Sequence, residues 1–91
     1  MNSFHAAGHL LVTLHLMSQN NETIELIGLC ERADVNLYKG LKALHLLGQL
    51  ELVNPRRLRL TLNGLVVAKN LLNLKHAGSP TWIEPLFQLA A

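Results

Sequence analysis

The 91-residue sequence predicts a single, mainly α-helical domain with one small antiparallel β-hairpin. Apolar residues recur at three- and four-residue intervals over most of the chain, which is the spacing of helix faces. Between residues 50 and 62 they alternate with other residues instead, which is the spacing of strands, and the helical spacing then returns. Apolar types make up 49% of the chain and charged types only 15%, so the chain can form a core and still leave apolar surface for self-association.

A first helix is expected over residues 4–18. Its apolar positions form a stripe at helical spacing, and the polar run SQNNE, which starts at Ser18, ends it. Val12 and Leu16 lie outside that stripe, so we expect this helix to contact protein on two sides, its own core and a partner subunit. The expected core positions are Ala7, Leu10, Leu11, Leu14 and Met17.

Two short helices are expected next, over residues 23–33 and 36–47. Thr23 is the expected cap of one and Asn36 the expected cap of the other. Only the turn Asp34-Val35 separates them, and two short helices joined by a tight turn form a helix-turn-helix pair. Their expected buried positions are Leu26, Ile27, Cys30 and Ala33 in the first, and Leu37, Leu41, Leu44 and Leu47 in the second, which Gly48 is expected to end.

Residues 50–62 are expected to form the hairpin. Asn54-Pro55 turns the chain, and alternation places Arg57 and Arg59 on the solvent face. The leucines of the two strands are expected to share the other face: Leu50, Leu52, Leu58, Leu60 and Leu62.

A fourth helix is expected over residues 62–76, with Thr61 as its cap. The tail, residues 80–91, is too apolar to be solvated and is expected to fold back or bind a partner, while Pro85 forbids one uninterrupted helix. Residues 1–91 thus follow the order of a winged helix-turn-helix: three-helix core, wing and C-terminal helix. The expected inner positions of the fourth helix are Leu65, Ala68, Leu71 and Leu72.

Two motifs resemble a known family. Leu37-Tyr38-Lys39-Gly40-Leu41-Lys42-Ala43-Leu44, followed by Gly48, is similar to the third-helix pattern of PadR-like and MarR-like winged-helix transcriptional regulators. Arg59-Leu60-Thr61-Leu62-Asn63-Gly64 resembles the exit from their wing. The resemblance covers about a third of the chain and implies a dimeric regulator that binds double-stranded DNA.

The chain departs from that family in three ways. His45, Leu46 and Leu47 stand where the family usually has charged residues, so this face is expected to be covered by protein. The hairpin is short, which limits the reach of a wing. Only the fourth helix and the tail stand in place of the family's long dimerisation region.

Positive charge is concentrated on residues 36–64. This segment carries five lysines and arginines against Glu51 alone, a net charge of +4, whereas the rest of the chain carries −2. A basic face on a slightly acidic body is typical of a protein that docks on phosphates.

Seven residues are the candidate DNA contacts. In a helix-turn-helix the start of the second helix lies nearest the base edges, where Asn can pair with adenine and Lys with guanine, while Tyr can donate to a phosphate. Arginines of the hairpin would meet the flanking backbone or enter a minor groove. The predicted set is Asn36, Tyr38, Lys39 and Lys42 on the helix and Arg56, Arg57 and Arg59 on the hairpin.

Each candidate has a plainer interpretation. Lys39 and Lys42 lie three residues apart and could be ordinary solvated charges. Arg56 and Arg57 could protect an exposed hairpin edge from aggregation. Tyr38 could pack on the preceding helix.

Other functions have little support in the sequence. His5 and His9 lie four residues apart, but the first helix has no carboxylate or cysteine to complete a metal site, so we expect these histidines at an interface or on the surface. No paired carboxylates, nucleophile elbow or phosphate-binding glycine loop is present, so neither an enzyme nor a cofactor is expected. Lone Cys30, expected to be buried, favours a reducing compartment, the cytoplasm, and no secretory signal or membrane span is recognisable.

The leading hypothesis is therefore a sequence-specific double-stranded DNA-binding protein, a transcriptional regulator that dimerises through the first helix, the fourth helix and the tail. The alternative is a winged-helix module that docks a protein partner. That alternative would use an apolar surface made of Leu46, Leu47, Trp82, Ile83, Leu86 and Phe87.

Overall fold

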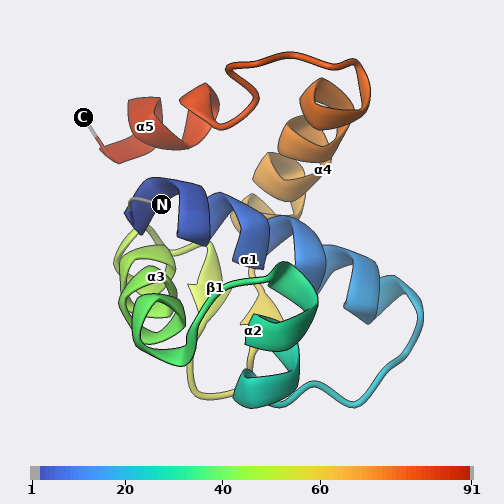
Figure 1. Cartoon of the computed structure of the whole chain (residues 1–91), viewed down its shortest axis with the longest axis vertical. Helices are drawn as coiled ribbons and strands as arrows, with labels where there is room; N and C mark the ends of the chain where they lie inside the picture. The colour runs from blue at the N-terminus through green and yellow to red at the C-terminus, as the bar shows by residue number, and fades with distance from the viewer. Residues whose placement is uncertain (1–2, 91) are drawn as a thin grey trace.

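The computed structural model describes residues 3–90 and contains five helices and a two-stranded antiparallel hairpin within that range (Figure 1). The mainly helical fold with one small hairpin is thus confirmed. The elements are α1 (Ser3–Gln19), α2 (Leu26–Ala33), α3 (Leu37–Gln49), β1 (Val53–Asn54), β2 (Arg59–Leu60), α4 (Leu62–His76) and α5 (Glu84–Ala90).

Helix α1 lies at the centre of the molecule, and every other helix and the hairpin packs around it (Figure 1). Its predicted stripe is buried, and Val12 is buried as well, while Leu16 is exposed. Because α2, α3, α4, α5 and β2 all contact α1, the chain's own packing explains the apolar arc as far as Val12 and leaves Leu16 exposed. A dimer interface on α1 is therefore not needed to explain why the buried side of this helix is so wide.

Helix α2 begins later than expected. Its N-cap is Glu25, whose side chain makes no capping bond, and Thr23 is exposed in the preceding loop, so the predicted Thr23 cap is wrong. Leu29 is buried and Ile27 is 62% exposed, so the predicted stripe is also wrong at this point. Two residues turn a helix by about 200°, so Ile27 must face solvent when Leu29 faces the core.

Helix α3 is capped as predicted, because the Asn36 side chain accepts a hydrogen bond from the Lys39 backbone N–H at 2.8 Å. It continues through Gly48 to Gln49, two residues beyond the predicted end at residue 47. Leu37 and Leu41, predicted to be buried, are about half exposed. The face that packs inward is instead Gly40, Ala43, Leu44 and Leu47.

Glycine explains this rotation of α3. A Cβ on Gly40 would overlap the sulfur of Cys30, so α2 and α3 approach each other closely at these two residues. That approach places the small side chains inward and turns Leu37 and Leu41 outward. A three- and four-residue rhythm fits both faces, so the spacing alone could not choose between them.

The hairpin is shorter than residues 50–62. Only Val53 pairs with Leu60 and Asn54 with Arg59, and residues 55–58 form the loop. The Asn54 side chain accepts hydrogen bonds from the backbone N–H groups of Arg56 and Arg57, at 3.1 and 3.3 Å. These two hydrogen bonds stabilise the loop, although only two residue pairs connect the strands.

Helix α4 starts where predicted. The Thr61 hydroxyl accepts a hydrogen bond from the Gly64 N–H at 3.0 Å and donates one to the Glu51 carbonyl at 2.7 Å. Ala68 and Leu71 are fully buried, whereas Leu65 and Leu72 are half-buried. Leu62 was placed on the apolar side of the hairpin, but it belongs to the first turn of α4 and is 84% exposed.

The tail folds back on α1 and α4. Ile83 and Leu86 are buried, and the rings of Phe87 and Phe4 lie 4.4 Å apart between centroids. Pro85 is tolerated because it lies in the first turn of α5, where no backbone N–H is needed within the helix. Since Leu47, Ile83 and Leu86 are in the core, the predicted apolar docking surface is wrong at those three positions.

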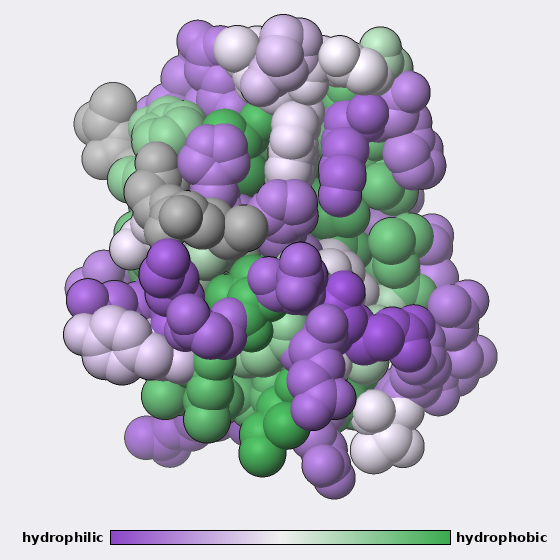
Figure 2. Space-filling model, viewed as in Figure 1, coloured by the Kyte–Doolittle hydropathy of each residue, from purple (hydrophilic) through white to green (hydrophobic). Residues whose placement is uncertain are grey.

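Apolar side chains nevertheless reach the surface. In Figure 2 they appear as several patches between hydrophilic residues. The largest exposed fractions belong to Leu62, Val66, Tyr38 and Ile27.

Candidate nucleic-acid interface

The outward ridge of α3 carries polar and aromatic side chains. Tyr38 is 67% exposed, and the ammonium of Lys42 lies 4.7 Å from the centroid of its ring. Tyr38 therefore faces solvent, and the alternative that it packs on α2 is wrong. His45 and Gln49 continue the ridge at helical spacing and are also exposed.

His45 and Gln49 are the two ridge positions that the sequence interpretation missed. His45 was expected to be covered by protein, together with Leu46 and Leu47, but only the two leucines are shielded, Leu46 partly and Leu47 fully. The signal that could have found them is the spacing 38, 42, 45 and 49, which follows one face of a helix.

At the start of α3, Asn36 already has a structural role. The oxygen of its side chain accepts the Lys39 N–H, and the same oxygen would have to accept the amino group of an adenine in a paired contact. Asn36 is therefore better suited to shaping the start of the helix than to reading a base. Lys39 is half-buried and lies off the ridge.

The three hairpin arginines are all exposed, but they border different grooves. Arg57 and Arg59 line a groove with the C-terminal end of α1, the α1–α2 loop and α4. Arg56 lines a second groove with Glu51, Asn54 and Pro55. The loop turns its successive arginines to opposite sides.

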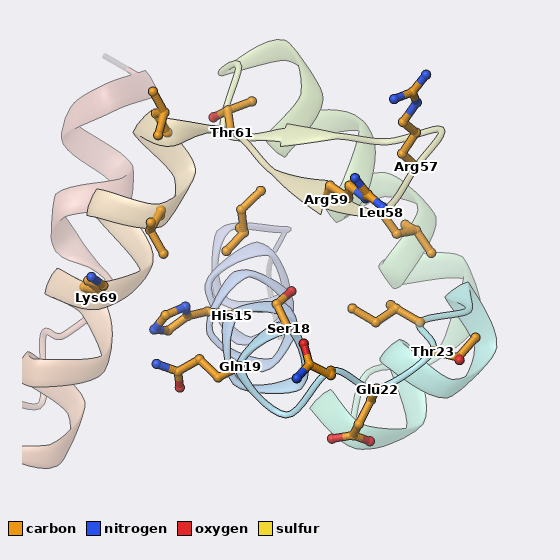
Figure 3. A pocket seen from close by; sticks show the side chains of 15 residues that line it. His15, Ser18, Gln19, Glu22, Thr23, Arg57, Leu58, Arg59, Thr61 and Lys69 are labelled. Carbon is orange, nitrogen blue, oxygen red and sulfur yellow. The ribbon is translucent and has the colours of Figure 1, made fainter.

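The groove beside Arg59 has a volume of about 840 Å³ (Figure 3). Arg59 lies along its hairpin side, and Lys69 of α4 lies on the opposite side, with His15, Ser18 and Gln19 of α1 between them. Lys69 was missing from the predicted site. No local pattern could have found it, because only the packing of α4 brings it opposite the hairpin.

The one carboxylate of this groove is already neutralised. Both oxygens of Glu22 accept hydrogen bonds from the Arg32 guanidinium, at 3.0 Å each, and this is the one ion pair found in residues 3–90. Burial, and next the ammonium of Lys69, lower the pKa of His15 below its ordinary 6.5. The groove therefore carries cations that pair with no carboxylate of residues 3–90, beside a histidine whose neutral form is favoured at pH 7.

The candidate contacts form two groups. Lys42 lines a shallow groove with Ser3 and Phe4, at the N-terminal end of α1, whereas Arg57 and Arg59 lie beside Ser18, near its C-terminal end. From Ser3 to Ser18 a helix rises about 22 Å. None of these three grooves, as the described residues 3–90 form them, holds the cations of both α3 and the hairpin.

Comparison of the chain with protein-family models, curated proteins and solved structures found no match. In the part of the chain that the structure describes, no three histidine, cysteine or acidic side chains converge where they could hold a metal ion. None of the described helices is long and apolar enough to cross a membrane. Cys30 is buried as expected, and burial raises the pKa of its thiol.

Proposed function

We propose that this protein is a winged helix-turn-helix regulator that binds double-stranded DNA in the cytoplasm. The hairpin carries the proposal: it exposes three arginines, its loop is fixed by Asn54, and no carboxylate among residues 3–90 pairs with any of the three. A short, rigid loop of unpaired guanidinium groups suits the phosphate backbone, since arginine binds phosphates through several N–H donors at once.

Helix α3 supports the other half of the proposal. It follows α2 after a short turn, and it presents Tyr38, Lys42, His45 and Gln49 in one exposed row. Each of these side chains has a donor or acceptor that can reach a base edge or a phosphate. Lys39 and Asn36 stand at the start of the same helix, Asn36 as its cap.

We further propose that the regulator acts as a homodimer through α4 and the tail. Leu62 is 84% and Val66 68% exposed, and they lie one turn apart on α4. Exposed apolar residues at this spacing favour a helix–helix contact. A two-fold dimer would present two copies of α3 to half-sites about one turn of DNA apart.

The proposal is tested by measuring the affinity of the protein for a labelled DNA duplex of random sequence, with fluorescence anisotropy as the readout. We expect binding at 50 mM salt that is largely lost at 200 mM, because each phosphate contact releases counterions. Replacing both Arg56 and Arg57 by Ala should weaken binding to all sequences about equally, whereas Lys42→Ala should change the preference among sequences. Glu31→Gln, which alters an exposed charge on α2, is the control for unspecific effects. Retention of full affinity by the arginine variant would refute the proposal.

The alternative, a protein-docking module, retains one favourable observation. Phe4, Leu41 and Leu46 line a largely apolar groove of about 470 Å³ beside α3. Capture of one protein partner with no dependence on salt, together with no DNA binding at 50 mM salt, would favour this alternative.

A further inference from the structure

The groove beside Arg59 is the strongest unassigned feature of the molecule. It is bordered by three parts of the chain that lie far apart in sequence: the C-terminal end of α1, the hairpin and α4 (Figure 3). Arg59 and Lys69 supply positive charge from opposite sides. Between them α1 contributes the hydroxyl of Ser18 and the amide of Gln19, both of which can donate hydrogen bonds.

Among residues 3–90, no hydrogen bond or ion pair engages the side chains of Arg59, Lys69, Ser18 and Gln19, which leaves these donors available to a ligand. Glu22 is the one acidic residue that lines the groove, and Arg32 already occupies both of its oxygens. The Thr61 hydroxyl is bonded within the chain at both its donor and its acceptor side. An anion with several acceptor oxygens would suit these cations and donors.

We propose that this groove binds the phosphates of one DNA strand, with Arg59 and Lys69 as cationic contacts on its two sides and Ser18 and Gln19 as neutral donors. This inference rests on the proposed function and extends it, because it adds α1 and α4 to an interface so far limited to α3 and the hairpin. Contacts of this kind fix the orientation of the protein on the duplex and carry no sequence information themselves.

The position of the groove gives this contact a specific role. It lies at the C-terminal end of α1, whereas Lys42 of α3 lies near the N-terminal end. Two anchors separated along α1 would hold the duplex against rotation about either one. In this arrangement Lys69 contacts the sugar-phosphate backbone of the DNA, away from the exposed row of α3 that we propose to contact base edges.

Lys69→Gln tests the inference, because it removes the charge from an exposed side chain and leaves a polar side chain only one atom shorter. The affinity for random duplex should fall at 50 mM salt, and equally for all sequences. One lost phosphate contact reduces the slope of log affinity against log salt by about 0.9. Between 50 and 200 mM salt the variant should therefore lose about 3.5-fold less affinity than the wild type does.

Lys75→Gln is the matched control on the same helix. Its ammonium lies over the Trp82 ring, at 5.2 Å from the centroid, and it does not line the groove. The control should keep the wild-type salt slope. A reduction as large as that of Lys69→Gln would show a general effect of net charge and would overturn the inference.

Nuclear magnetic resonance gives a second readout that does not depend on the variants. Random duplex added to the labelled wild-type protein should shift the backbone amide signals of Ser18, Gln19 and Lys69. If the duplex binds and Lys69→Gln keeps the full salt slope, with these signals unmoved, the groove inference fails while the proposed function stands. If the wild type binds no duplex at 50 mM salt, both fail.

Discussion

Single residues fix how closely the helices and the hairpin approach. Gly64, in the first turn of α4, faces the backbone of Leu52, and a Cβ at this position would overlap the Leu52 carbonyl group. The backbone of Leu52, which leads into β1, cannot move aside as a flexible side chain would. This glycine is therefore required by packing, since its own backbone is ordinary helix.

Gly64→Ala should destabilise the protein by about 1–3 kcal/mol, the usual range for an overpacked position. Gly28→Ala is the matched control, because beyond its chain neighbours and the nearby backbone of α2 no atom lies within 4 Å of the added Cβ, and alanine favours helix by up to about 1 kcal/mol. Urea unfolding followed by circular dichroism measures both. Equal midpoints for Gly64→Ala and the wild type would contradict the close approach.

Asn36 and Asn54 show what the sequence could predict at this scale. The Asn36 cap and the turn at Asn54 were both expected, because each depends on hydrogen bonds to residues at most three positions away. Lys69 was not expected, because its neighbours in the groove come from other elements.

At the scale of elements, the tail is held to α1 and α4 around the Trp82 ring. The ring of His9 meets it edge-on, 5.0 Å between centroids, and Lys75 lies over it. Burial lowers the pKa of His9, with smaller contributions from the charges of Lys75 and His5, while Asp34 opposes them. Protonation of His9 is thus disfavoured where the tail docks.

This pKa shift predicts a loss of stability in acid. The unfolded chain binds a proton at His9 near the ordinary pKa of 6.5, whereas the folded chain does so only at lower pH, and His15 behaves alike. The contribution of these two histidines to the free energy of unfolding should therefore be constant above about pH 7.5 and fall as the pH drops through 6.5. Urea midpoints at pH 8.0 and 5.5, read from the fluorescence of Trp82, measure it.

His9→Gln should reduce the difference between the two midpoints, because one of the shifted groups is gone. His45→Gln, on the exposed ridge of α3, is the control for removing a histidine. The prediction is wrong if the wild-type midpoint is the same at both values of pH.

At the scale of the whole molecule, apolar surface remains on α4 after the core is complete. Leu62 and Val66 are among its most exposed side chains and contribute little to folding. Replacing both by Ser should convert the proposed dimer to a monomer. Because dimerisation stabilises the folded chain by mass action, the urea midpoint of the wild type should rise with protein concentration and that of the variant should not. Analytical ultracentrifugation measures the mass.

Ile27→Ser is the matched control, since Ile27 is similarly exposed but lies on α2. It should leave the mass unchanged. A wild-type protein that sediments as a monomer at concentrations where it binds DNA would rule out the dimer.

The sequence by itself determined the elements of this protein, because helix spacing, caps and alternation are local. The order of helices, the hairpin, the Asn36 and Thr61 caps and the buried stripe of α1 all follow from it. Only the tertiary structure decided which faces of α2 and α3 are buried. Close approach at Gly40 turned Leu37 and Leu41 outward, and packing of the tail buried Ile83 and Leu86, which had been assigned to a partner-docking surface.

The same distinction separates the two parts of the candidate site. The arginines of the hairpin and the lysines of α3 were recognisable because they are neighbours in sequence. Their division between the two ends of α1, and the place of Lys69 opposite Arg59, depend on packing between elements far apart in the chain. Contacts of that kind leave no periodic signal in the sequence, since they are set by how the helices fit together.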